Sequence, residues 1–341
     1  MPHRIHGVDA ARGLAIIGMI LAHTIPASSR LYSLAPLGVI HGRSAALFAV
    51  VAGISLGFIT GNNHRGESVR IQVARISGRA LALIPLAVFT MMLPARVYTI
   101  LGSYALWFVL VLPLLYAPVA LLIATSVVLI FGAWAAVVWW GPIEIPLVTT
   151  SAYPAITYLA YLLIGLAVAH FDIRRSSTRA ALAGIGLILA AVPLAVWMSL
   201  GGNLSRAIAW PQRPGFPVAS NAGELVLFAA DILPHCDSPA QVIHAAGCAL
   251  VIISLCVTIA MRIPALIVVL AVPGTVALSI YVGHLVILAL VAERSARLGV
   301  GLVVVMVAAA FVWRAVFQRG PLEHYVALIS RLAGRLAASN S

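Results

Sequence analysis

Long apolar segments, separated by short polar ones, run through the whole chain. Ten of them are long and apolar enough to cross a bilayer as helices of about 20 residues. They lie near residues 8–25, 42–60, 79–95, 104–122, 124–141, 154–170, 179–199, 241–261, 274–292 and 299–317. A further apolar segment, 263–273, could form a separate half-span. The pattern predicts an all-α polytopic membrane protein with about ten transmembrane helices.

The placement of arginine predicts how these spans are oriented. All 21 basic residues are arginine, and 14 of them fall on the inner side if the N-terminus is inside. Because arginine-rich short loops stay in the cytoplasm, we expect both termini to be cytoplasmic and the long loop 201–240 to be outside. The expected domains are a transmembrane domain over 1–320 and a cytoplasmic amphipathic tail helix over 321–341.

Composition supports this class and excludes others. Hydrophobic residues make up 62% of the chain, charged residues 9%, and the mean hydropathy is +1.08, which is far from a soluble domain. The net charge of +12 does not predict nucleic-acid binding, because the arginines form short clusters between apolar segments. The three cysteines have no metal-ligand spacing, so we expect neither a metal nor a disulfide framework.

The first span carries three ionisable residues in an otherwise apolar sequence. Asp9 and Arg12 lie at its start and His23 near its end. Eleven positions of about 100° each bring Arg12 and His23 to one helix face, roughly 16 Å apart. Ionisable groups on one stripe of a membrane helix normally face a protein interior or a water-filled cavity. The alternative is that Asp9 and Arg12 anchor the span at the interface and His23 ends it.

Other spans and loops carry further candidates. His41 and Arg43 begin the second span, whose outer end we expect near His23 because the connection is short; Arg43 could instead reach for lipid headgroups. His284 lies near mid-membrane in the ninth span, where a histidine is either functional or hydrogen-bonded between helices.

The polar loops add four more. Arg70, Arg75 and Arg79 follow the second span and suit either anionic lipid or a phosphate-rich cytosolic cofactor. His235 lies four residues after Asp231 in the outer loop, but the spacing is not that of a metal site.

Several motifs together resemble one family. The opening GVDAARGLAIIGMILAH resembles the signature of the transmembrane acyltransferase superfamily, which includes the acyltransferase-3 proteins and heparan-alpha-glucosaminide N-acetyltransferase. The segment LFAVVAGISLGF resembles the family's second span, although Ala52-Gly53 replaces the Ser-Gly of acyltransferase-3 and favours the glucosaminide-acetyltransferase branch. Three further segments are similar to a bacterial branch: TTSAYPAITYLAYLLIGLAVAHFD, ILPHCDSPAQVIHAAGCAL and QRGPLEHY.

The resemblance implies acyl transfer from cytosolic acyl-CoA, most often acetyl-CoA, to a hydroxyl or amino group of a sugar or glycolipid at the outer side. His23 would then be the general base or a transient acyl carrier, and Asp9 would orient Arg12. Cofactor binding would fall to four arginines: Arg12, Arg70, Arg75 and Arg79. The acceptor side would be lined by His41, Arg43 and His235, where a developing oxyanion needs hydrogen-bond donors, with Tyr153 and His284 as weaker candidates.

The main alternative is a transporter or flippase that uses the same polar groups without covalent chemistry. The abundance of Ala, Arg and Val and the absence of lysine suggest a GC-rich bacterial genome. We therefore expect a multi-pass protein of the bacterial cytoplasmic membrane.

Overall fold

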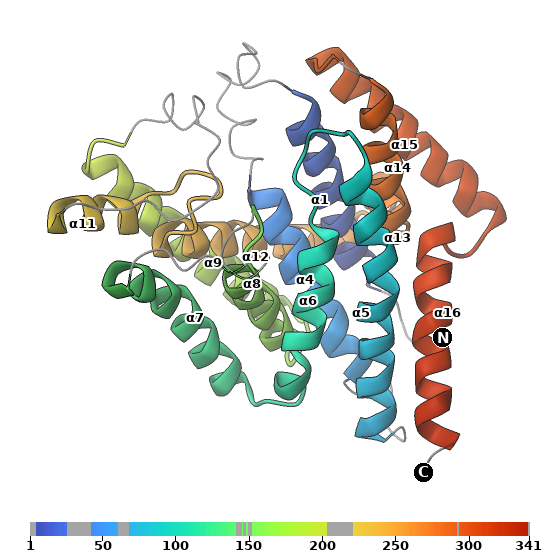
Figure 1. Cartoon of the computed structure of the whole chain (residues 1–341), viewed down its shortest axis with the longest axis horizontal. Helices are drawn as coiled ribbons and strands as arrows, with labels where there is room; N and C mark the ends of the chain where they lie inside the picture. Colours follow the sequence, from blue (N-terminus) through green and yellow to red (C-terminus); the bar gives the residue numbers. More distant parts are fainter. Residues whose placement is uncertain are drawn as a thin grey trace.

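The computed structural model describes residues 5–25, 42–60, 68–140, 145, 148, 152–202, 221–291 and 293–339. In these ranges it is all-helical (Figure 1). Its thirteen α-helices and one 3-10 helix are α1 (His6–Thr24), α4 (Arg43–Thr60), α5 (Val69–Met92), α6 (Leu101–Leu110), η2 (Leu112–Leu114), α7 (Val119–Trp140), α8 (Ala155–Val168), α9 (Ser176–Ser199), α11 (Ala222–Ala230), α12 (Pro239–Arg262), α13 (Pro264–Thr275), α14 (Ala277–Leu290), α15 (Ala296–Val316) and α16 (Pro321–Ser339).

Each of the ten predicted segments coincides with at least part of a described helix. Six helices are long and apolar enough to cross a membrane, namely α4, α5, α7, α9, α12 and α15, and the bent pair α13 and α14 would make a seventh span. α6 and α8 are shorter apolar helices. The all-helical, multi-pass class is therefore supported, whereas the count of ten spans and the cytoplasmic termini stay predictions.

Two boundaries differ from the prediction for local reasons. α5 begins at Val69, ten residues before the predicted span, because the side chain of Ser68 caps the helix by accepting from Ile71 N. The arginine-bearing loop thus continues directly into the span. The predicted span 104–122 is interrupted at 111–118, where Pro113 and Pro118 lie, and proline removes a backbone donor and disfavours helix in the preceding residue.

Glycines allow two close helix crossings. A methyl group added at Gly53 of α4 would collide with the carbonyl oxygen of Leu162 in α8, and one at Gly165 of α8 would collide with that of Val50 in α4. α1 and α13 approach one another in the same reciprocal way through Gly13 and Gly274. Small residues at such crossings let the backbones of membrane helices meet.

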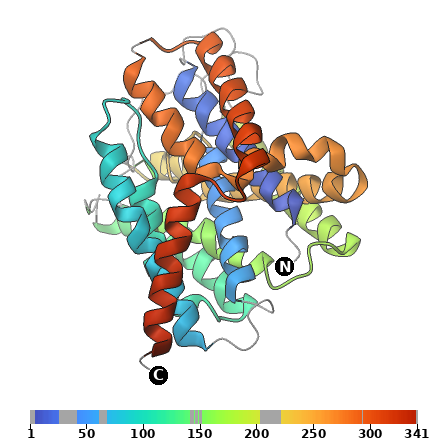
Figure 2. The ribbon, with the colours of Figure 1, turned by 90° about the vertical axis from the view of Figure 1, so that its right-hand side faces the viewer.

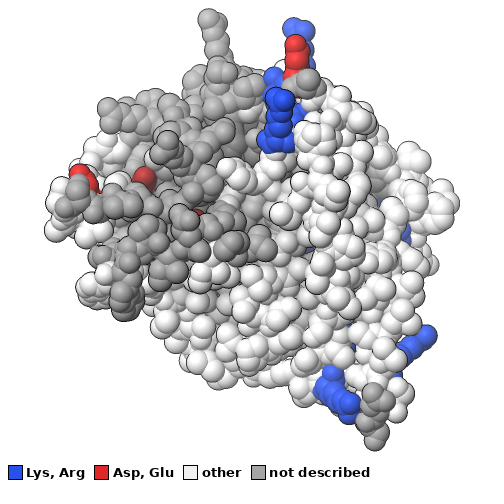
Figure 3. Space-filling view, in the orientation of Figure 1, with Lys and Arg blue, Asp and Glu red and all other residues white. Residues whose placement is uncertain are grey.

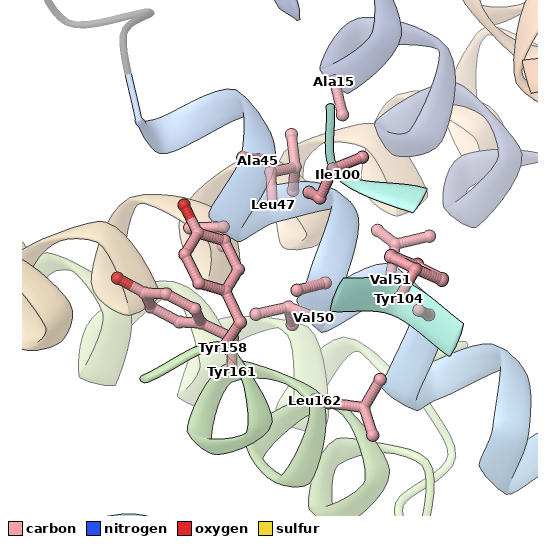
Figure 4. Packing of buried hydrophobic residues seen from close by; sticks show 14 of the residues in the cluster. Ala15, Ala45, Leu47, Val50, Val51, Ile100, Tyr104, Tyr158, Tyr161 and Leu162 are labelled. Atoms are coloured by element: carbon pink, nitrogen blue, oxygen red, sulfur yellow. The ribbon is translucent and has the colours of Figure 1, made fainter. Parts of the chain in front are cut away.

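α4 lies at the centre of the core and packs against α1, α8 and α12. Val50 and Val51 of α4 are fully buried between Tyr104 of α6 and Leu162 of α8 (Figure 4). The ring of Trp107 stacks on that of Tyr158 at 5.0 Å. The hydroxyl groups of Tyr158 and Tyr161 project from α8 in the same direction. The phenol groups of these tyrosines therefore lie beside an otherwise apolar centre.

The outer faces of the bundle are apolar. Large hydrophobic side chains of α7, α9 and α15 are exposed, for example Val128, Ile188 and Val312. In Figure 3 the larger groups of Arg side chains lie at the upper edge and at the lower right, the Asp and Glu side chains lie at the upper edge and on the left, and a broad uncharged surface lies between the two groups of Arg. Exposed apolar surface of this extent is typical of lipid-facing helices.

α16 runs alongside the arginine-bearing half of α5, and Figure 2 shows this pair from the side. The hydroxyl of Ser330 donates to the carbonyl of Arg75 at 2.9 Å. Gly334 of α16 packs against the Arg75 side chain. The tail helix is thus attached to the start of α5, and its own first turn contacts the first residues of α14 through Glu323.

Candidate active site

Arg12 of α1 is held by three helices. Its guanidinium donates to the Asp9 carboxylate at 2.8 Å, to the hydroxyl of Ser55 in α4 at 2.7 Å, and to the carbonyl of Gly274 in α13 at 3.3 Å. Asp9 is 4% exposed, so its charge is compensated by this ion pair, as burial requires. The arrangement fixes the position of a cationic side chain where α1, α4 and α13 meet.

The local sequence explains this geometry. Gly13 follows Arg12 and allows the α13 backbone to approach α1, which brings the Gly274 carbonyl within reach of Arg12. Gly53 in α4 plays the matching part against α8, and Ser55 lies two residues later on the face that meets Arg12. In both the Arg-Gly motif of the first span and the Gly-x-Ser motif of the second, the glycine lets a neighbouring helix approach closely. The polar residue of each motif, Arg12 or Ser55, takes part in the hydrogen bonds at that point.

A cavity of about 440 Å³ opens beside Arg12, which lies within the usual range for small-molecule sites. Its basic residues are Arg12, Arg79 and Arg319, and its acid is Glu323. Apolar and aromatic residues complete the lining, among them Phe48, Leu56, Leu83, Leu101, Tyr104, Phe108, Tyr281 and Val326. A pocket with apolar walls and a few cationic groups suits a ligand that is partly apolar and partly anionic.

The start of α14 also faces this cavity. Thr275, Ala277 and Leu278 line it, at the point where the α13–α14 pair bends by 68°. The Glu323 carboxylate accepts from Leu278 N at 2.7 Å, from Ser279 N at 3.1 Å and from the Ser279 hydroxyl at 2.5 Å. These are the first-turn amides of α14, so Glu323 caps the helix and stabilises the break.

The predicted cofactor arginines separate into two groups. Arg79 lines the cavity, and its buried Nε has no hydrogen-bond partner among the described residues. Arg75 instead packs against Gly334 of α16, and Arg70 is exposed at the start of α5. Arg319, which was not predicted as a site residue, also lines the cavity. Its position in the family-like QRGPLEHY segment could have indicated it.

His23 and His284 meet at the other end of α1. Nδ1 of His23 lies 3.0 Å from Nε2 of His284, and the rings are nearly parallel with centroids 5.3 Å apart. His284 is fully buried, and its Nδ1 lies 3.3 Å from the carbonyl oxygen of Ile280. The pair joins residues that are 261 positions apart in the chain.

These contacts assign the protons of the neutral pair. A carbonyl only accepts, so His284 carries its proton on Nδ1 and its Nε2 is an acceptor. His23 must then donate from Nδ1 to His284, which leaves the lone pair of His23 on Nε2. His284 thus orients His23 and makes its Nε2 the basic nitrogen.

Tyr281 connects the cavity with the histidine pair. Its ring lines the cavity and contacts the His284 ring edge-on at 5.2 Å. The Tyr281 hydroxyl accepts from Ile100 N at 3.0 Å, which holds the ring in place. A ligand that fills the cavity would therefore contact Tyr281, whose ring packs against His284.

A second polar cluster contains the other predicted residues. Nδ1 of His235 lies 2.7 Å from the carbonyl oxygen of Ala152, and its ring packs edge-on against Tyr153. Arg43, which is 9% exposed, donates to the carbonyl of Ile232 at 2.6 Å. The structure thus brings Arg43, Tyr153 and the 231–238 loop together, whereas His23 pairs with His284. His41 lies outside the described residues.

The 231–238 loop is unusual in its backbone and its electrostatics. His235 and Asp237 adopt left-handed φ angles of 59° and 52°, which non-glycine residues rarely do and which cluster at functional sites. Burial lowers the pKa of His235 to about 4 and raises the pKa of Asp237 to about 7, against a side-chain hydrogen bond from Thr157 that acts in the other direction. His235 is therefore neutral at pH 7, whereas Asp237 changes its protonation state near pH 7.

Asp231 does not join His235 on a helix face, because α11 ends at Ala230. Its carboxylate accepts from Leu233 N at 3.0 Å instead. Among the residues that the structure describes, no group of three or more His, Cys, Asp or Glu side chains is placed to hold a metal ion.

One of the comparisons with known proteins identifies a family. Residues 4–201 match the family model of heparan-alpha-glucosaminide N-acetyltransferase, catalytic. The matched range is more than half of the chain and contains Asp9, Arg12, His23, Ser55 and Arg79. A comparison with curated proteins finds no match. The chain therefore belongs to the family of the heparan-alpha-glucosaminide N-acetyltransferase catalytic domain.

Proposed function

We propose that this protein is a membrane acyltransferase that moves an acetyl group from acetyl-CoA to a hydroxyl or amino group of a sugar or glycolipid. The observation that carries the proposal is the cavity beside Arg12, where three arginines and the start of α14 converge on an apolar pocket. Family membership supports the reaction class. The proposed setting is the bacterial cytoplasmic membrane, with the donor entering from the cytoplasm and the acceptor at the outer side.

The cavity suits the donor chemically. Acyl-CoA combines phosphates with a long neutral arm and a thioester, and guanidinium groups bind phosphate bidentately. Arg79 has a buried Nε to offer, and Arg12 is already oriented by Asp9 and Ser55. The partial positive charge at the start of α14 adds to this attraction, while its cap Glu323 limits the positive charge. The apolar walls would hold the arm and direct the thioester toward Tyr281.

His23 is the proposed general base. The acceptor O–H or N–H loses its proton to Nε2 of His23 while its oxygen or nitrogen attacks the thioester carbonyl carbon. The C–S bond then breaks, and the thiolate of CoA takes up the proton that His23 holds. His284 accepts the Nδ1–H bond throughout and stabilises the transient imidazolium. A positioned base of this kind contributes ~10²–10⁴ in rate.

The second polar cluster is the proposed acceptor side. His235 and Arg43 are held by backbone carbonyls of loops, and Tyr153 packs against the His235 ring, so their positions do not depend on a bound ligand. Neutral histidine, phenol and guanidinium are suitable partners for the hydroxyl groups of a sugar. His41 is assigned to the same side from its place in the sequence.

One experiment tests donor binding and chemistry together. Purified protein is incubated with labelled acetyl-CoA and the acceptor fraction of the membrane, and both binding and acetyl transfer are measured. Arg79→Gln should weaken binding about tenfold or more, as loss of a charge-assisted contact predicts. Arg70→Gln, in the same helix but exposed, is the matched control and should bind as wild type.

The same experiment separates chemistry from folding at His23. His23→Gln keeps a hydrogen-bonding group but cannot take up a proton at neutral pH. It should bind acetyl-CoA normally and lose at least 99% of transfer, about the smallest effect expected for a general base. Equal binding by the Arg79 and Arg70 variants, or turnover in His23→Gln above about a tenth of wild type, would refute the respective assignment.

A transporter or flippase is the second candidate, favoured by the bent α13–α14 pair. Discontinuous helices whose half-helix N-terminus faces a cavity are typical of secondary transporters. Such folds repeat the break in both halves, and one bent pair is found among the described residues. The labelled product decides: a transporter would release its substrate without a new acyl bond.

A further inference from the structure

A second cavity lies at the junction of α15 and α16. Its volume is about 700 Å³, and its lining includes Trp313, Phe317, His324 and Arg331. Gln318 and Arg319 line this cavity and the cavity beside Arg12. The two cavities are therefore neighbours that share the short linker between α15 and α16.

An aromatic platform forms one wall of the second cavity. The rings of Trp313 and Phe317 stack with centroids 4.5 Å apart at an angle of 28°. Trp313 Nε1 donates to the carbonyl of Arg319 at 2.8 Å, and Arg314 donates to the carbonyl of Phe317 at 3.2 Å. These bonds tie both the platform and the linker in place. Phe317 is 50% exposed, so part of its ring is open to a ligand.

The remaining polar lining is cationic or neutral. Arg319 and Arg331 supply guanidinium groups and His324 an imidazole, and the lining contains no carboxylate among the described residues. An aromatic face beside arginines is the combination that binds a nucleobase and its phosphates, since bases stack on aromatic rings and arginine binds phosphate bidentately.

We infer that this second cavity binds the nucleotide end of the acyl-CoA donor. The adenine stacks on the Phe317 and Trp313 platform, and the two phosphates of the adenosine 3′,5′-bisphosphate part lie between Arg331 and Arg319. Because Arg319 lines both cavities, the molecule passes from its nucleotide in the second cavity to its arm and thioester in the first. This inference rests on the proposed function and adds a site for the part of the donor that the first cavity leaves outside.

The experiment compares two donors on the intact protein in defined detergent. Acetyl-CoA carries the adenosine 3′,5′-bisphosphate, whereas S-acetyl-4′-phosphopantetheine lacks it and keeps the arm, thioester and one phosphate. Arg331→Gln and Phe317→Leu should each weaken acetyl-CoA binding about tenfold. Neither change should alter the affinity for S-acetyl-4′-phosphopantetheine by more than about twofold, because that donor has nothing to place in the second cavity. Arg335→Gln, one turn further along α16 and exposed, is the matched control for both donors.

The outcomes also separate this inference from the proposed function. Equal weakening toward both donors, or no weakening toward acetyl-CoA, would overturn the nucleotide site. An Arg331 effect that depends only on added anionic lipid would assign the cavity to a lipid headgroup and overturn it too. If the wild-type protein binds neither donor, the proposed function itself is refuted, and the nucleotide site with it. Binding of S-acetyl-4′-phosphopantetheine that depends on Arg79 but not on Arg331 would leave the proposed function standing.

Discussion

Gly13→Ala offers the sharpest test of how the first helix builds the site. The added methyl group would collide with the carbonyl oxygen of Leu270 in α13, and with the backbone nitrogen of Gly274 close by. Both are backbone atoms of a neighbouring helix, so a side-chain rotation does not relieve the contact. α1 and α13 must move apart.

Two opposing effects set the magnitude. Overpacking at a tight contact costs about 1–3 kcal/mol, and the higher helix propensity of alanine returns up to about 1 kcal/mol. A net loss of about 1–2 kcal/mol is expected. Separation of the helices also lengthens the bond between Arg12 and the Gly274 carbonyl, now 3.3 Å, so acetyl-CoA binding should weaken several-fold.

Gly184→Ala in α9 is the matched control, because no atom lies within 4 Å of its added methyl group. This variant should be stabilised by about 0.5–1 kcal/mol through helix propensity alone. Denaturant titration in detergent micelles measures both free energies of unfolding, and a binding titration with acetyl-CoA measures the second effect.

A double mutant tests the mechanism itself. Gly274→Ala places its methyl group on the carbonyl oxygen of Asp9, so it forces apart the same crossing. Once one substitution has separated the helices, the second should cost less, and the two effects should be less than additive. If Gly13→Ala is as stable as Gly184→Ala and binds acetyl-CoA normally, the close crossing is not what positions Arg12.

Two further predictions concern the ends of the site. Glu323→Ala should lower the free energy of unfolding by roughly 2–4 kcal/mol, because two first-turn amides of α14 lose their charged cap. In the same unfolding titration Glu323→Gln should lower it by about half as much, and the control Arg335→Ala should leave it unchanged. A Glu323→Ala variant as stable as wild type would contradict the capping role. Asp237 has a pKa of 3.8 unfolded and about 7 folded, so its stabilising contribution is present below about pH 4 and is lost as the pH rises through 7. Asp237→Asn should therefore gain stability relative to wild type between pH 4 and 7, by up to about 4 kcal/mol. His235 acts in the opposite direction: its pKa falls from 6.5 to about 4 on folding, so its contribution to stability is lost as the pH drops. Because His235 is present in both proteins, the comparison of the variant with wild type removes its effect. A difference between variant and wild type that does not change with pH would refute the burial of Asp237.

The sequence by itself determined the features that depend on neighbouring residues. Runs of about 20 apolar residues require helices in a membrane, because only a helix satisfies every backbone group within its own segment. The ion pair between Asp9 and Arg12 follows from i,i+3 spacing and is present at 2.8 Å. The motifs of the first two spans, together with three further segments, indicated the family, which the match over residues 4–201 supports.

Only the tertiary structure decided which distant residues meet. The bond of Arg12 to Ser55, the pairing of His23 with His284, and the capping of α14 by Glu323 each join different helices. The 68° bend between α13 and α14 turns the start of α14 toward the cavity. Arg79 and Arg319 line that cavity, whereas Arg70 and Arg75, with the same residue type and a similar setting in sequence, do not.

The physical reason lies in the uniform apolarity of membrane helices. A soluble helix shows its buried face through hydrophobic periodicity, but a helix that is apolar on all sides shows none. Which faces meet is then decided by glycines that permit backbone contact and by polar groups that need a partner away from water. The need of Arg12 and His284 for partners can be read along the chain; the partners themselves depend on how α1, α4, α13 and α14 cross.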